Sequence, residues 1–371
     1  MTRPDLSFLS VVRDGPDDYV IGNGETFVNV PAIAADVVAL LDGTRTVDEV
    51  RAEIHRTRGV DVDVADFVAG LDAAGLLRPP QRPPNLWDRI SPATARPFFS
   101  TAANVLIGLV ACGALAAVIA RPEIIPSYDE IVWADSLAFT VSFAVGSWLL
   151  VFVHEFSHIL AARSLGVRAE LSLGTRLQFL VVQTRVTGIW QTPRRSRYRV
   201  HLAGMRTDFL LVCACLCALY VTDNDVVRLV MLICLSQIVW QFLFFMRTDV
   251  YFAYANLTGN KNLMDDAQTY LRARLARRPA PKVPASVRRY AWFLVVGRVL
   301  GLGFFAGYTV PLTVVTCARA LDEIAAAPGV PAGPVATLAI ITLGWALYLY
   351  VFVSRRIRSR RAAPAPAAAA G

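Results

Sequence analysis

A short polar motif inside an apolar stretch is the part of this sequence best suited to chemistry. His154, Glu155 and His158 form an H-E-x-x-H pattern between the apolar residues 151–153 and 159–160. Residues four positions apart share one face of a helix, so the two imidazoles can bind one metal ion. Glu155 lies one residue further round, where it can act as the general base on a water molecule. With zinc and a third protein ligand, these residues would form a hydrolytic site.

The surroundings of this motif favour a function over a chance match. The chain contains only four histidines, and two of them belong to the motif. Ionisable groups are costly at membrane depth, and those found there usually serve a function. The alternative is a structural or degenerate motif, that is, an ordinary polar turn of a helix. We therefore predict a metal site.

A third ligand has to come from elsewhere in the chain. His55 belongs to the N-terminal region and His201 to the edge of an apolar run, so neither is a strong candidate. Asp208 and Asp249 each end an Arg-Thr-Asp triplet beside an apolar run. The topology predicted below places Asp249 at the same membrane face as His158, so we favour Asp249 and keep Asp208 as the alternative.

The composition indicates a mainly α-helical membrane protein. Of the 371 residues, 55% are hydrophobic, and the mean hydropathy is +0.47. Apolar stretches of about 18 residues or more are typical of membrane-spanning helices. Six such runs occur, at about 100–120, 136–162, 201–222, 226–246, 290–316 and 334–353. We therefore expect about six transmembrane helices.

The charge distribution predicts the orientation of these helices. The formal net charge is +8, but residues 1–96 hold 15 acidic and only 10 basic residues. The positive excess gathers in connections 163–199 and 272–289 and in the tail 355–361, which alternate with arginine-poor connections. This is the positive-inside pattern rather than a nucleic-acid-binding surface. We expect a multi-pass protein of the cell membrane with both termini in the cytoplasm and no nucleic-acid partner.

Residues 1–80 predict a small α+β domain of the winged-helix type. Strands are expected near 11–12, 19–21 and 26–30, followed by helices that begin at about Pro31, Thr46 and Asp63. A Pro-rich linker (81–99), a membrane domain (100–353) and a basic, Ala/Pro-rich disordered tail (354–371) complete the predicted organisation.

A β-hairpin is predicted on the cytoplasmic side within residues 168–190. Residues 170–173 and 178–182 alternate as strands do, and Gly174-Thr175 between them reads as the turn. An exposed edge of this hairpin could hold a peptide in extended form, as a peptidase requires. A purely structural hairpin is the alternative.

Two resemblances to known families follow from these segments. Residues 27–30, 40–50 and 71–77 resemble the PqqD-like domains that recognise ribosomally made, modified peptides. This resemblance implies that the domain binds a leader peptide by strand addition. A generic winged helix, or a docking domain with another ligand, is the alternative.

The membrane portion resembles the site-2 protease class of intramembrane zinc metallopeptidases, the M50 peptidases. The matching segments are 154–158, 203–204, 249–252 and 262–263. The resemblance implies that His154, His158 and Asp249 bind Zn²⁺ and that Glu155 is the catalytic base.

The second motif of that family is only partly present. Phe244 stands where the family often has proline, Val250 stands where it has glycine, and the usual asparagine is missing. Gln237, Gln241 and Asp249 would align on a continuous helix, so Gln241 could replace the missing amide. The alternative is that both glutamines hydrogen-bond between helices.

Together these features predict a membrane-embedded zinc endopeptidase that removes a leader or matures a ribosomally made peptide. A regulated protease of a signalling protein is one alternative. A catalytically inactive peptide-binding or immunity protein is another, although an inactive copy would not need Glu155. A transporter is a weaker alternative, since the chain contains no P-loop signature.

Overall fold

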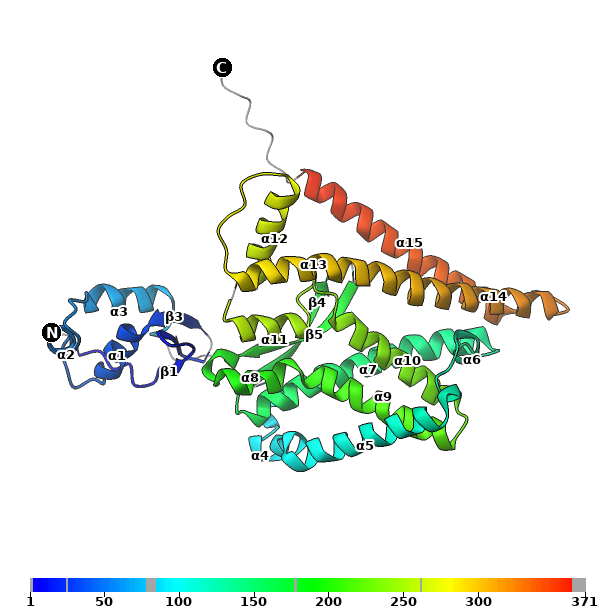
Figure 1. Cartoon of the computed structure of the whole chain (residues 1–371), viewed down its shortest axis with the longest axis horizontal. Coiled ribbons are helices and arrows are strands. Elements are labelled where there is room, and N and C mark those ends of the chain that lie inside the picture. The colour runs from blue at the N-terminus through cyan, green and yellow to red at the C-terminus, as the bar shows by residue number, and fades with distance from the viewer. Residues whose placement is uncertain (1–2, 25, 78–84, 177–178, 261, 362–371) are drawn as a thin grey trace, which may run out of the picture.

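The structure is a computed structural model and describes residues 3–24, 26–77, 85–176, 179–260 and 262–361. The protein is mainly helical, with a small N-terminal sheet and a second two-stranded sheet that packs against the helix α7 (Ser136–Ser164) (Figure 1).

The N-terminal unit contains three antiparallel strands and three helices, as predicted. The strands β1 (Ser10–Arg13), β2 (Asp18–Gly22) and β3 (Phe27–Pro31) pair in the order β1-β2-β3, and α1 (Ala32–Leu40), α2 (Val47–Arg58) and α3 (Val64–Ala73) follow. Thr46 closes a capping box with Glu49, and the Asp63 side chain accepts from the Asp66 N–H. These elements share an apolar core that includes the buried side chains of Ile21, Val37, Leu41, Val50, Ile54 and Leu76.

Residues 85–99, predicted as linker, form short helices that pack on the membrane part. They are η1 (Leu86–Arg89), α4 (Pro92–Ala95) and η2 (Arg96–Phe99). Arg163 donates to the Ile90 carbonyl at 2.9 Å and lies 3.3 Å from the Asp88 carboxylate. These contacts hold the segment against the end of α7 (Ser136–Ser164). Residues 81–84 of the predicted linker lie outside the described residues.

Within the described residues, five helical segments are long and apolar enough to cross a membrane: Pro92–Ala120, Ser136–Ser164, Ala203–Val221, Ala285–Ala326 and Ala332–Ser354. They contain α5 (Thr101–Ala120), α7 (Ser136–Ser164), α9 (Ala203–Val221), the continuous rod α13 (Ala285–Phe304), η5 (Phe305–Thr309) and α14 (Val310–Ala326), and most of α15 (Ala332–Arg361). In Figure 1, α5, α7, α9 and α10 run side by side, and α15 returns along α14.

The fourth predicted span is shorter than expected. It forms α10 (Asp225–Gln241), which has 17 residues and ends well before residue 246. The chain then leaves the helix and starts again at α11 (Asp249–Thr258). The Thr248 hydroxyl donates to the Gln241 carbonyl at 2.7 Å, and the Gln241 side chain accepts from the Asp249 N–H at 3.0 Å. The continuous helix expected from Gln237 to Asp249 is therefore wrong, because side-chain hydrogen bonds join two separate helices.

The remaining helices are short. They are η3 (Pro122–Ile124), α6 (Tyr128–Ile131), η4 (Ile189–Gln191), α8 (Arg194–His201) and α12 (Leu263–Leu275).

The predicted hairpin exists, but its turn lies further along the chain. The strands β4 (Arg168–Arg176) and β5 (Phe179–Thr187) pair antiparallel, with Gly174 opposite Val181 and Thr175 opposite Leu180. The prediction of a turn at Gly174-Thr175 is wrong because both residues belong to the strand ladder. The connecting residues 177–178 lie outside the described residues.

At the C-terminal end, α15 continues to Arg361, past the start of the predicted disordered tail at residue 354. No glycine or proline occurs between residues 354 and 361, so nothing in this basic segment interrupts the helix. The part of the predicted tail from Ala362 onward lies outside the described residues.

Candidate metal centre

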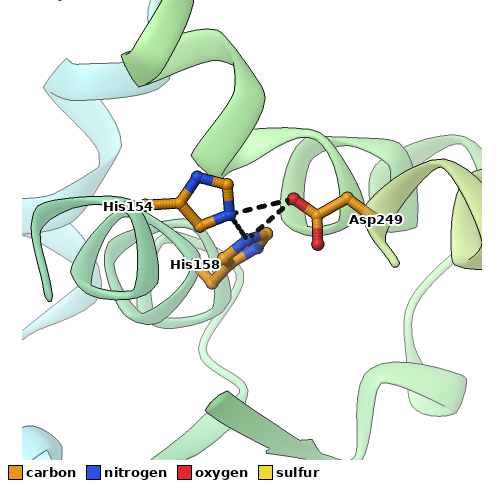
Figure 2. A group of neighbouring side chains, drawn as sticks. All are labelled: His154, His158 and Asp249. Atoms are coloured by element: carbon orange, nitrogen blue, oxygen red, sulfur yellow. Dashed lines mark hydrogen bonds and ion pairs between the residues drawn. The ribbon is translucent and has the colours of Figure 1, made fainter. Parts of the chain in front are cut away.

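Three of the predicted site residues lie together where α7 meets the start of α11. His154 and His158 project from one face of α7, and Asp249 is the first residue of α11 (Figure 2). One ligand atom from each residue lies within 4.8 Å of the others. The Asp249 Oδ2 atom is 3.2 Å from His154 Nε2 and 3.1 Å from His158 Nε2, and the two Nε2 atoms are 3.3 Å apart. These distances therefore match a site in which three side chains bind one metal ion.

The other nitrogen of each imidazole is already engaged. His158 Nδ1 lies 2.7 Å from the Val200 carbonyl oxygen, which can only accept, so this nitrogen carries the hydrogen. His154 Nδ1 lies 2.7 Å from Asp208 Oδ2, and an ionised carboxylate likewise accepts. In neutral imidazoles the two Nε2 atoms then present lone pairs toward Asp249 Oδ2. Among the described residues that oxygen is buried and has no hydrogen-bond donor.

Three converging lone pairs repel one another unless a cation lies between them. The donor set of two imidazoles and one carboxylate suits zinc and other divalent transition metals. The hydrogen bonds to the far nitrogens are the arrangement by which proteins fix the tautomer of a ligating histidine. The residues present therefore fit a divalent metal ion.

Asp208, the alternative third ligand, occupies a different position. Its side chain is fully buried on α9 and contacts the far nitrogen of His154 rather than the converging Nε2 atoms. It is not one of the three clustered ligand atoms. Asp208 therefore holds the ring of His154 in place, a role that its sequence pattern did not distinguish from ligation.

Gly204 lies directly against the His154 imidazole. A Cβ atom added at this position would overlap the ring at Nε2, Cε1 and Cδ2. Helix α9 can approach α7 this closely only because residue 204 lacks a side chain. This contact explains physically why a glycine occurs at the start of α9.

Glu155 lies beside the cluster and is held by the hairpin. Its Oε2 atom accepts from the Thr184 N–H at 2.7 Å, and its backbone carbonyl accepts from the Thr184 hydroxyl at 2.9 Å. This N–H points away from β4, so it belongs to the outer edge of β5. A cavity of about 430 Å³ and one of about 220 Å³ meet at this carboxylate, since Glu155 lines both. Alternate residues of β5 complete their walls: Val182, Thr184 and Val186.

The two glutamines of α10 differ in their surroundings. The Gln241 side-chain oxygen accepts a hydrogen bond from the Asp249 N–H, and this bond helps to start α11. Among the described residues, the Gln237 amide nitrogen and oxygen are both buried without a hydrogen-bond partner. Gln237 lines the larger cavity together with His154 and Glu155. Gln237, rather than Gln241, therefore offers a free amide to a molecule in that cavity.

The other two histidines stay apart from the cluster. His201 stacks on Phe252 with ring centroids 6.0 Å apart and lines the smaller cavity, and its burial lowers its pKa to about 4. His55 is exposed on α2. Neither belongs to the group of three ligand atoms, as the sequence indicated.

Comparisons of the chain with protein-family models, with curated proteins and with solved structures give no match.

Proposed function

We propose that this protein is a zinc-dependent endopeptidase of the membrane, similar to the site-2 proteases (M50). One observation carries the proposal. The ligand atoms of His154, His158 and Asp249 converge beside Glu155, which lies on α7 with the two histidines. Converging acceptors of this kind favour a cation between them, and Glu155 is the residue type that peptide hydrolysis requires next to such a cation. The two cavities give a peptide access to that carboxylate from both sides.

Each residue then has a distinct task. Zinc bound by His154, His158 and Asp249 would act as a Lewis acid on the peptide carbonyl. Glu155 takes a proton from the attacking water and delivers it to the leaving nitrogen, so water adds across the C–N bond. Asp208 and the Val200 carbonyl keep the imidazoles oriented.

The hairpin suits a substrate in extended form. Alternate side chains of β5 line the cavities, and β5 is an edge strand whose Thr184 N–H already donates to a carboxylate. We propose that the peptide pairs with this edge and that Glu155 exchanges the Thr184 N–H for water. The free amide of Gln237 would then hydrogen-bond to the backbone of the peptide.

The N-terminal unit would capture the substrate. We assign it as a PqqD-like leader-binding unit in which the peptide adds to β3, an edge strand of the sheet. This unit contacts η4, which follows β5 almost directly. A captured leader would thus raise the local concentration of the peptide near the hairpin. In this proposal the hairpin and both termini lie in the cytoplasm. The protein would then process a ribosomally made, modified peptide at the inner face of the cell membrane.

Metal analysis of the detergent-purified protein tests this proposal. We expect about one zinc per chain in wild type. Metal should be lost in His154→Ala and Asp249→Ala. Glu155→Gln should keep the metal but fail to cleave a peptide. Asp265→Ala, which removes an exposed carboxylate on α12, is the matched control and should keep both properties. A wild-type protein that neither contains a divalent metal nor takes one up would overturn the protease assignment.

A further inference from the structure

Arg298 lies within the apolar part of the membrane rod formed by α13, η5 and α14. Arg298 is exposed on α13, and among the described residues it has no carboxylate within ion-pair distance and no hydrogen-bond acceptor. An unpaired charge in a membrane helix is costly, so such a residue usually marks a binding site or reaches the headgroup region.

The spacing of charges places Arg298 at one headgroup level. The next charged residue along the rod is Arg319, and the 20 residues 299–318 between them are uncharged. At about 1.5 Å per helical residue they span about 30 Å, the thickness of the hydrocarbon core of a bilayer. If Arg298 and Arg319 mark the two edges of the hydrocarbon layer, Arg298 lies at the edge on the side where α13 begins, eight residues beyond the start at about 290 that hydropathy predicts.

An apolar cavity starts at this arginine. It has a volume of about 680 Å³ and is lined from Arg298 through Leu302 and Phe305 to Thr313 on the rod. The opposite walls come from α15 and from the end of α10, and they include Trp345, Tyr348 and Trp240. Tryptophan and tyrosine are the residues typical of the headgroup level. The cavity thus joins one cation at the membrane surface to an apolar interior that extends into the hydrocarbon layer.

We infer that this cavity is a binding site for an anionic phospholipid. The phosphate group pairs with the Arg298 guanidinium, and one acyl chain lies between the rod and α15. Basic pockets between membrane helices bind anionic headgroups in this way, and charge complementarity selects an anionic lipid over a zwitterionic one. The site is separate from the metal centre, although Trp240 and Phe304 form part of both this cavity and the larger cavity beside Glu155.

Native mass spectrometry of the full chain, released from phosphatidylcholine nanodiscs with a small fraction of phosphatidylglycerol, tests the inference. Wild type should retain one phosphatidylglycerol molecule in preference to phosphatidylcholine. Arg298→Gln should weaken this retention about fivefold, the factor expected for one cation at a lipid surface. Arg289→Gln, which removes an exposed cation nine residues earlier on the same helix, should leave it unchanged.

A second variant tests the apolar part of the site. A Cβ atom at Gly344 meets no atom within 4 Å, so Gly344→Leu fits the fold while its side chain fills the cavity. Retention of the lipid should fall here as well.

Three results would overturn the inference. The first is equal retention of phosphatidylglycerol in Arg298→Gln and Arg289→Gln. The second is displacement of the lipid by inorganic phosphate together with no effect of Gly344→Leu on lipid retention. The third is a loss of dimer rather than of lipid in both Arg298→Gln and Gly344→Leu. In the last case the cavity would be an interface between two copies of the chain. None of these readouts depends on metal content or cleavage, so the lipid site and the protease proposal fail independently.

Discussion

Two buried charged clusters both contact α8, and they differ in how completely their polar atoms are satisfied. Arg197 donates to the Asp14 carboxylate at 2.6 Å and to the Thr192 and Trp190 carbonyls at 3.0 Å, and its guanidinium lies over the Trp190 ring. This cluster joins the N-terminal unit to α8, and Figure 1 shows the two side by side. In the other cluster, ligand atoms of His154, His158 and Asp249 converge on one another, and among the described residues the buried Asp249 Oδ2 atom has no hydrogen-bond donor.

The difference separates a structural cluster from one built for a ligand. A buried charge whose hydrogen bonds are complete holds elements together, whereas buried acceptors that face one another need a cation. Helix α8 connects the two clusters, because the Val200 carbonyl, which orients His158, follows Arg197 by one turn. Substitutions in both clusters test this interpretation.

The largest effect is expected at Glu155. Glu155→Gln keeps the size of the side chain but removes its basicity, so peptide cleavage should fall about 10²–10⁴-fold. Metal content and thermal stability should stay at the wild-type level, because the side chain is not part of the ligand set. A peptide-cleavage assay with parallel metal analysis measures this, and retained cleavage would remove Glu155 from the mechanism.

The next largest effect, on stability, is expected at the ion pair of Arg197 and Asp14. Arg197→Met leaves Asp14 buried without its main partner, which costs about 3–5 kcal/mol. Hydrogen exchange and limited proteolysis should show the N-terminal unit detaching from η4 and α8. The double variant Asp14→Leu, Arg197→Met should recover much of this loss, because it removes both charges. If the single variant remains as protected as wild type, the ion pair does not hold the unit in place.

A smaller effect is expected at Asp208. Asp208→Asn retains the shape of the side chain but weakens its hold on the His154 imidazole, so metal affinity should fall about 10–100-fold. Titration with a competing chelator measures the change. Complete loss of metal, equal to that in Asp249→Ala, would instead identify Asp208 as a ligand.

The smallest effect is expected far from both clusters, at the start of α2. Thr46→Ala removes the side-chain acceptor of the capping box and should lower the stability of the N-terminal unit by about 1 kcal/mol. The Thr46 N–H holds the pKa of Glu49 below its ordinary value. The contribution of this carboxylate is therefore present at neutral pH and lost as the pH falls through the lowered pKa. Thermal unfolding at neutral and acidic pH measures both effects, with Thr57→Ala at the other end of α2 as the control.

Much of the N-terminal unit could be predicted because its signals are local. The capping residues Thr46 and Asp63 lie within three residues of the N–H groups that they bind. The membrane helices were predicted from the length of their apolar runs alone. The exception is α10, where side-chain hydrogen bonds end the helix early. Helix α10 ends at Gln241 because Thr248 and Asp249 bond back to that residue, and no hydropathy pattern encodes such bonds.

By itself, the sequence determined that His154 and His158 share a face and that Glu155 lies beside them, because residues four apart lie on the same face of a helix. Only the tertiary structure decided that Asp249 joins the two Nε2 atoms while Asp208, 54 residues from His154, contacts the far side of its ring. The same packing left the Gln237 amide unpaired in the cavity. Helical periodicity is a property of the local backbone, whereas these placements depend on how α9 and α10 pack against α7 and how α11 packs against α8.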